Sequence, residues 1–175
     1  ITEADQDKIA AKARSCGVQV ETHAIGDRGN RVTLDIYARA LGGAVDSDHR
    51  WRIEHAQVLA PDDIVRLAKM HVIAAMQPTH ATSDMGWAEE RVGAQRIVGA
   101  YAWQSLRRSG ARLALGSDFP VEQVDPRLGL QAAVTRQDGQ GLPVGGWYPE
   151  QRLTSAQALD GFTAGAAYAG FAELE

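Results

Sequence analysis

Histidine and aspartate side chains follow each of the short apolar segments that could form strands in this sequence. They are His23 after VQVET, His55 after WRIE, His80 after VIAAMQPT and Asp118 after LALGS. Neutral imidazoles and a carboxylate are suitable ligands for a divalent metal such as zinc, and a metal held in this way can activate water. The carboxylate can then take the proton that the water releases. The residue types therefore predict a hydrolytic metal site in which His23, His55 and Asp118 are ligands.

Each of these side chains also has an ordinary structural explanation. A single histidine after a strand is commonly a packed or a solvated residue. Glu21 and Glu54, which stand close to two of the histidines, could simply form ion pairs. Asp118 could be a turn residue or a helix cap, which are common roles of aspartate. The coincidence of such residues at several strand ends favours the metal site.

The elements that must position these side chains alternate between helix and strand patterns. Predicted helices span residues 2–15, 30–41, 61–70, 87–97, 101–108, 126–135 and 154–167, and predicted strands span residues 18–22, 51–54, 72–76 and 112–115. Residues 79–85 and 139–149 are predicted to be loops. The alternation predicts an α/β fold with a parallel sheet. Because the carboxyl ends of parallel strands lie at one edge of the sheet, we expect the candidate side chains to converge there.

Composition indicates an ordinary globular domain and excludes several functions. The chain has 175 residues, of which 45% are hydrophobic, and its formal net charge of −4 argues against a nucleic-acid-binding surface. No apolar run approaches the roughly 18 residues of a membrane span. The single cysteine, Cys16, excludes an internal disulfide and is expected to pack in the core. We expect a cytoplasmic protein with neither nucleic acid nor membrane as a partner; the chain opens at Ile1 rather than methionine, so its true N-terminus is expected upstream.

The runs around these residues resemble a known family. They are ETHAIGDRGN, RIEHAQ, QPTHATSD, LALGSDFPVE and FTAGAAYAGFAE, in this order along the chain. Together they resemble the amidohydrolase superfamily, in the branch of metal-dependent hydrolases that includes N-substituted formamide deformylase and proteins called exoenzyme regulatory protein. The resemblance implies a (β/α)8 TIM barrel that carries a small β-sandwich and binds one or two divalent metals, usually zinc. This chain resembles about four βα units of it, strands five to eight, and is therefore expected to be a partial barrel.

The resemblance also implies a role for each candidate residue. His23 and His55 match metal-binding histidines after the fifth and sixth strands. Asp118 matches the aspartate after the eighth strand, which binds metal and carries the catalytic proton. His80 matches a histidine after the seventh strand and is expected to be catalytic and to contact the substrate. Arg28, in the turn that follows His23, is expected to bind a substrate group or to stabilise the oxyanion.

Two features of the family pattern do not occur in this chain. The family has H-x-H on its first strand and a metal-bridging lysine after its fourth, whereas this chain has no H-x-H and its three lysines, Lys8, Lys12 and Lys69, lie in predicted helices. We therefore expect residues 1–175 to be a single-domain fragment of a longer barrel, with weak or no metal binding and no catalysis alone. Four strands cannot close a barrel, and the open sheet edges predict that a homodimer or the missing barrel half covers them.

The function implied by the resemblance is hydrolysis of a C–N bond in a small non-peptide amide. Two alternatives remain open. One is a non-catalytic α/β module for binding or regulation, in which the histidines are structural. The other is a metal-dependent hydrolase that acts on a lactone or a phosphoester instead of an amide.

Overall fold

The computed structural model describes residues 1–42 and 48–174, and at its centre is a four-stranded sheet. The strands are β1 (Glu21–Ala24), β2 (Arg52–His55), β3 (Ile73–Met76) and β4 (Leu113–Leu115), in the spatial order β1-β2-β3-β4. Each neighbouring pair is parallel, and Ile53 of β2 pairs with Thr22 on one side and Ala74 on the other. The predicted α/β fold with a parallel sheet is confirmed.

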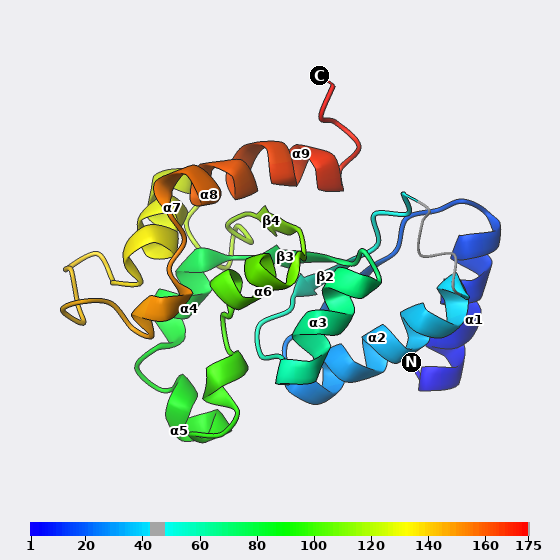
Figure 1. The fold of residues 1–175 in the computed structure, drawn as a ribbon, viewed down its shortest axis with the longest axis horizontal. Helices are drawn as coiled ribbons and strands as arrows, with labels where there is room; N and C mark the ends of the chain where they lie inside the picture. The colour runs from blue at the N-terminus through cyan, green and yellow to red at the C-terminus, as the bar shows by residue number, and fades with distance from the viewer. Residues whose placement is uncertain (43–47, 175) are drawn as a thin grey trace.

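Helices flank this sheet on two sides (Figure 1). They are α1 (Glu3–Ser15), α2 (Asp27–Leu41), α3 (Pro61–Lys69), α4 (Pro78–Asp84), α5 (Ala88–Val92), α6 (Trp103–Ser109), α7 (Pro126–Thr135), α8 (Ser155–Asp160) and α9 (Ala166–Ala169). Short 3-10 turns lie at Ile97–Gly99 and Pro149–Gln151, and a π-helical segment, Gly161–Gly165, joins α8 to α9. In Figure 1, α2, α3 and α6 lie on one side of the sheet, and α8 and α9 lie on the other. Among the described residues, every helix is too short or too polar to span a membrane.

Two of the predicted helices begin at capping boxes. The side chain of Thr2 accepts a hydrogen bond from the backbone N–H of Asp5, and the Asp5 carboxylate accepts one from the N–H of Thr2. Thr154 and Gln157 make the same exchange at the start of α8. These bonds satisfy N–H groups that the start of a helix leaves without partners, and they fix where α1 and α8 begin.

The core lies between the sheet and the helices α2, α3 and α6. β3 is buried along its whole length, as expected for a central parallel strand. Large, fully buried side chains from the adjoining elements form the core around it; they include Leu34, Ile53, Leu67, Trp103 and Leu106. β1 lies at the edge of the sheet, and its residues Glu21 and His23 are exposed. The buried strand β3 leads to His80, and β2, which lies between β1 and β3, ends in His55.

Three local predictions are wrong. Residues 79–85, predicted to be a loop, lie almost entirely in α4, because Pro78 occupies the first turn of a helix, where its missing N–H costs nothing. The helix predicted over residues 87–97 is interrupted after α5, where Gly93 adopts a φ of 80°. Cys16 is exposed at the C-terminal end of α1 instead of packing in the core.

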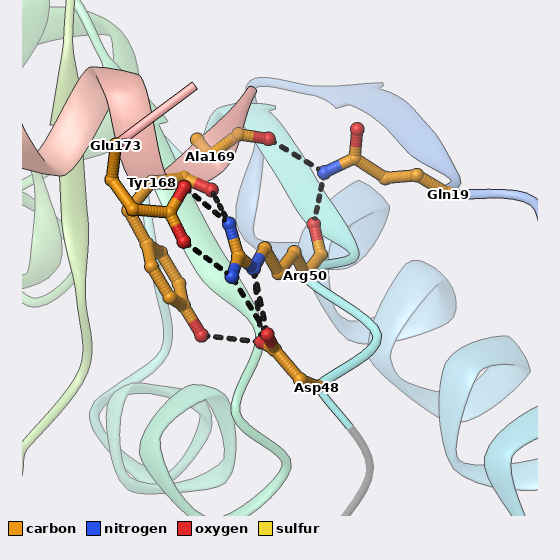
Figure 2. Close-up of polar contacts among 6 residues, drawn as sticks. All are labelled: Gln19, Asp48, Arg50, Tyr168, Ala169 and Glu173. Atoms are coloured by element: carbon orange, nitrogen blue, oxygen red, sulfur yellow. Dashed lines mark hydrogen bonds and ion pairs between the residues drawn. The ribbon is translucent and has the colours of Figure 1, made fainter. Parts of the chain in front are cut away.

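An arginine at the amino end of β2 ties that strand to the end of α9 (Figure 2). The Arg50 guanidinium donates to the carbonyl oxygen of Tyr168 at 2.7 Å and to the Glu173 carboxylate at 2.7 and 2.8 Å. It also donates to Asp48 at 2.7 Å and lies over the rings of Tyr168 and Phe171, 3.9 and 4.1 Å from their centroids. The side chain of Arg50 is only 8% exposed. We call these five residues the arginine clamp.

Replacing Arg50 by methionine is expected to lower the melting temperature by several degrees at pH 7, because both carboxylates and the Tyr168 carbonyl lose their donor. Hydrogen bonds from Arg50 and Tyr168 lower the pKa of Asp48 to about 2, and those from Arg50 lower the pKa of Glu173. Since unfolded carboxyl groups have pKa values near about 4, these groups stabilise the fold above that pH. The stabilisation is lost as the pH falls through the folded-state pKa.

The difference in melting temperature between the wild type and Arg50→Met should therefore shrink between about pH 4 and pH 2, as followed by circular dichroism. Arg127→Met is the matched control. Arg127 pairs with Asp125 at 2.6 Å but is 86% exposed, and exposed pairs contribute little to stability. An Arg50→Met protein that melts with the wild type at pH 7 contradicts a stabilising clamp.

Candidate metal centre

The structure brings three of the four candidate side chains together at the carboxyl edge of the sheet. His55 ends β2, His80 lies in the first turn of α4 directly after β3, and Asp118 follows β4. These three each offer one ligand atom, and the atoms all lie within 4.8 Å of one another. His23, in β1, lies beside this group, with its ring edge-on to that of His55 at 4.6 Å between centroids. We call His55, His80 and Asp118 the rim cluster.

One ring nitrogen of His80 is buried without a hydrogen-bond partner among the described residues. The ring stacks on the His55 ring at 5.6 Å. Its Nε2 atom is buried and makes no hydrogen bond to any residue that the structure describes. The nearest acidic oxygen, Oδ2 of Asp118, is 3.7 Å from this nitrogen, which is too long for a hydrogen bond. A buried nitrogen without a partner costs about 1–3 kcal/mol. The position of Nε2 of His80 is therefore that of an atom that binds a ligand between His80 and Asp118.

Unusual backbone angles aim two members of the rim cluster. His55 has a φ of 75° and Asp118 a φ of 58°, in the left-handed region that favours glycine. Such conformations cost of order 1–3 kcal/mol and occur often at functional sites. The backbone of Asp118 closes a turn by accepting from the N–H of Val121 at 2.8 Å, so aspartate does have the turn role that its sequence context allows. Its side chain is 35% exposed and faces His80.

A hydrogen bond with Gln77, which is itself bonded to Glu54, supports the ring of His55. Nδ1 of His55 lies 2.9 Å from Oε1 of Gln77, and Nε2 of Gln77 donates to Oε1 of Glu54 at 2.8 Å. Burial lowers the pKa of His55, and the hydrogen bond with Gln77 opposes this shift. The imidazole is therefore neutral at pH 7, as a metal ligand must be.

Glu54 lies in a group of charged side chains beneath the rim. Burial, followed by its contact with Glu21, raises the pKa of Glu54 to about 7, and Arg52 opposes this shift. Arg52 also pairs with Glu21. The ion-pair explanation of Glu21 and Glu54 is thus correct as far as it goes, but Glu54 in addition holds Gln77. Arg52, Glu54, Gln77 and Asp118 line a cavity of about 240 Å³ whose far wall is formed by small residues of α9 and its C-terminal cap.

Two more residues concern the site: Arg28, which the sequence predicts, and Gln77, which it does not. Arg28 is exposed in the first turn of α2, and no hydrogen bond or ion pair joins its side chain to another described residue. The sequence does not single out Gln77, because an amide is neither a typical zinc ligand nor an acid. The available signal was its place between the end of an apolar strand and Pro78.

Comparison with known proteins identifies relatives along almost the whole chain. The model of a family described as the amidohydrolase family matches residues 2–175. The sequence is 39% identical over 163 residues to Protein LONG AFTER FAR-RED 3 of Arabidopsis thaliana, which covers 91% of this chain and 27% of that protein. It is 26% identical over 165 residues to N-substituted formamide deformylase of Arthrobacter pascens, covering 92% of this chain and 29% of the relative.

A solved structure shares the fold. An uncharacterized metal-dependent hydrolase from Pyrococcus horikoshii aligns with a TM-score of 0.82 at 33% sequence identity, over 98% of this chain and 34% of its own. This chain therefore spans less than a third of the length of the curated relatives above. The four parallel strands and their helices correspond to part of an amidohydrolase barrel, which confirms the expected partial barrel and the family resemblance.

Proposed function

The chain belongs to the amidohydrolase family, and we propose that it is part of a metal-dependent hydrolase. This hydrolase cleaves a C–N bond in a small non-peptide amide. The observation that carries the proposal is the rim cluster, in which His55, His80 and Asp118 each place a ligand atom within 4.8 Å of the others. The names of two relatives support it, since one is a metal-dependent hydrolase and the other a deformylase of N-substituted formamides.

The donor set fits a divalent metal, with zinc as the first candidate. Two imidazoles and one carboxylate are typical protein ligands of zinc, and three protein ligands leave a position for water or substrate. The buried Nε2 of His80, which has no hydrogen-bond partner among the described residues, fits the same role. A bound metal would supply Lewis acidity toward the substrate carbonyl and would lower the pKa of water.

His80 and His23 each have a role implied by the family resemblance. That resemblance implies a catalytic role and a substrate contact for His80, whereas the spacing of the rim cluster favours a ligand role, and we propose the latter. His23 touches His55 from another side. We keep it as a proposed ligand, in line with the one or two metals that the resemblance implies.

Asp118 is the proposed proton carrier. Its carboxylate lies in the rim cluster and lines the cavity beneath it. We propose that it takes a proton from the attacking water and delivers that proton to the leaving amine. The products are a carboxylic acid and an amine. We propose Arg28, exposed at the start of α2, as a contact for a polar group of the substrate.

A substrate panel tests the proposal on the protein at the full length that its gene encodes. The panel contains N-substituted formamides and other amides, lactones and phosphotriesters, each assayed with zinc, after chelation and after zinc is restored. We expect amide hydrolysis that disappears on chelation and returns with metal. Turnover confined to lactones or phosphotriesters would overturn the C–N specificity, and absence of both turnover and metal binding would favour the non-catalytic module.

A further inference from the structure

Gln77 joins a proposed metal ligand to a half-buried carboxylate, that of Glu54. Its side-chain oxygen lies 2.9 Å from Nδ1 of His55, and its side-chain nitrogen donates to Oε1 of Glu54 at 2.8 Å. Gln77 is 5% exposed and His55 7% exposed. Water is therefore largely excluded from the contact between Gln77 and His55. No sequence motif assigns a role to this glutamine.

The bond to Glu54 determines which end of the amide faces His55. The amide nitrogen of Gln77 points toward Glu54, where Oε1 accepts its hydrogen bond. The amide oxygen then points toward His55. Since that oxygen can only accept, the hydrogen of the neutral imidazole must be on Nδ1. This leaves the lone pair of Nε2 on His55 free for another partner.

The sequence explains why Gln77 is fixed in this place. It follows the fully buried strand β3, and Pro78 after it restricts Gln77 to extended backbone, with φ −121° and ψ 104°. Glu54 comes from the neighbouring strand β2, where its register partner is Ala75 of β3. His55 follows at once and turns away from the strand with its left-handed backbone. Such a turn does not by itself fix the rotation of the imidazole ring. The hydrogen bond with Gln77 supplies that constraint.

We propose that Gln77, held by Glu54, is a positioning residue that keeps His55 in the Nδ1–H tautomer and aims its Nε2 lone pair into the rim cluster. This rests on the proposed function, because it concerns how a ligand of that metal site is prepared. Partners that hold the second ring nitrogen of a metal-binding histidine typically change metal affinity by about 10- to 100-fold when they are removed. Gln77 should thus act on metal affinity through His55 without touching substrate.

The first test reads the tautomer directly and needs neither metal nor activity. In ¹⁵N-labelled, metal-free protein of the full gene-encoded length, long-range ¹H–¹⁵N spectra distinguish Nδ1–H from Nε2–H histidine. We expect the Nδ1–H pattern for His55 in the wild type and a shift toward Nε2–H in Gln77→Met. An Nε2–H pattern for His55 in the wild type would overturn the proposal.

The second test measures zinc affinity by competition with a chelator of known affinity. Gln77→Met should bind zinc about 10- to 100-fold more weakly than the wild type. The matched control is Gln151→Met: Gln151 is 8% exposed, and it too makes two hydrogen bonds, both to Ser105. That variant should lose stability but keep its zinc affinity. Equal zinc affinities in the two variants contradict the proposal.

A second pair of variants keeps the proposal testable if Gln77→Met fails to fold. Glu54→Gln retains an oxygen that accepts from Gln77 and should keep both the tautomer and the zinc affinity. Glu54→Met removes that acceptor, lets the Gln77 amide rotate, and should weaken both. A protein that shows these effects but hydrolyses no amide disproves only the proposed function. A protein that hydrolyses amides with His55 in the Nε2–H form disproves only the role of Gln77.

Discussion

Asp118→Asn is expected to reduce kcat for amide hydrolysis at least about 100-fold, while the metal stays bound. General acid–base groups typically contribute about 10²- to 10⁴-fold, and asparagine cannot accept or return the proton of water. Asparagine nevertheless has the shape of aspartate and keeps an oxygen within the rim cluster. Steady-state kinetics on the best amide of the panel, together with metal content by mass spectrometry, check both parts of this expectation.

Asp125→Asn is the control for this substitution. Asp125 lies in the same loop and caps the start of α7, where its side chain accepts from the N–H of Arg127. Asparagine caps helices about as well as aspartate, so this variant should keep wild-type turnover. Near-normal kcat in Asp118→Asn would remove Asp118 as the proton carrier, whereas loss of metal from that variant would show that its charge is needed to hold the ion.

His55→Ala is expected to weaken zinc binding by more than about 100-fold. Loss of an outer partner of a metal-binding histidine costs about 10- to 100-fold, and loss of the ligand itself should cost more. His55 is central in the site, because its ring contacts those of both His23 and His80. Chelator competition measures the change. Hydrolysis should fall in parallel at limiting zinc.

His49→Ala serves as the matched control. His49 is 8% exposed and lies before β2, at the opposite end of the strand from His55. Its ring accepts from the N–H of Trp51 and contacts the carbonyl of Met70. The variant should therefore melt at a lower temperature but keep its zinc affinity. If His55→Ala binds zinc as tightly as the wild type does, the rim cluster is not the metal site.

The sequence predicts the fold well because its signals are local. Short apolar strands alternate with capped helices, and this pattern alone predicts parallel strands. Parallel strands in turn predict that residues after their carboxyl ends meet. His55 and Asp118 meet in this way, with a ligand atom of each within 4.8 Å of the other. The capping boxes at Thr2 and Thr154 mark helix starts for the same reason, since both partners lie within one turn.

The remaining features depend on contacts between distant residues. The arginine clamp joins Arg50 to Tyr168 and Glu173, which are more than a hundred residues away along the chain. The support of His55 by Gln77 depends on the register of β2 against β3 and on the hydrogen bond that orients the Gln77 amide toward Glu54. The helix that carries His80 is not predicted from the sequence, because the polar composition of residues 79–85 is typical of loops. None of these features has a periodic signal that a single sequence could display.

The most direct test of the metal site is an anomalous difference map measured at the zinc absorption edge. The crystals would contain the protein at its full gene-encoded length, grown with zinc. We expect a zinc peak within bonding distance of His55, His80 and Asp118, with Nδ1 of His55 still hydrogen-bonded to Gln77. The proposed metal site is contradicted if the map shows no zinc at the rim cluster. It is also contradicted if zinc binds only elsewhere and Nε2 of His80 is hydrogen-bonded to protein or water.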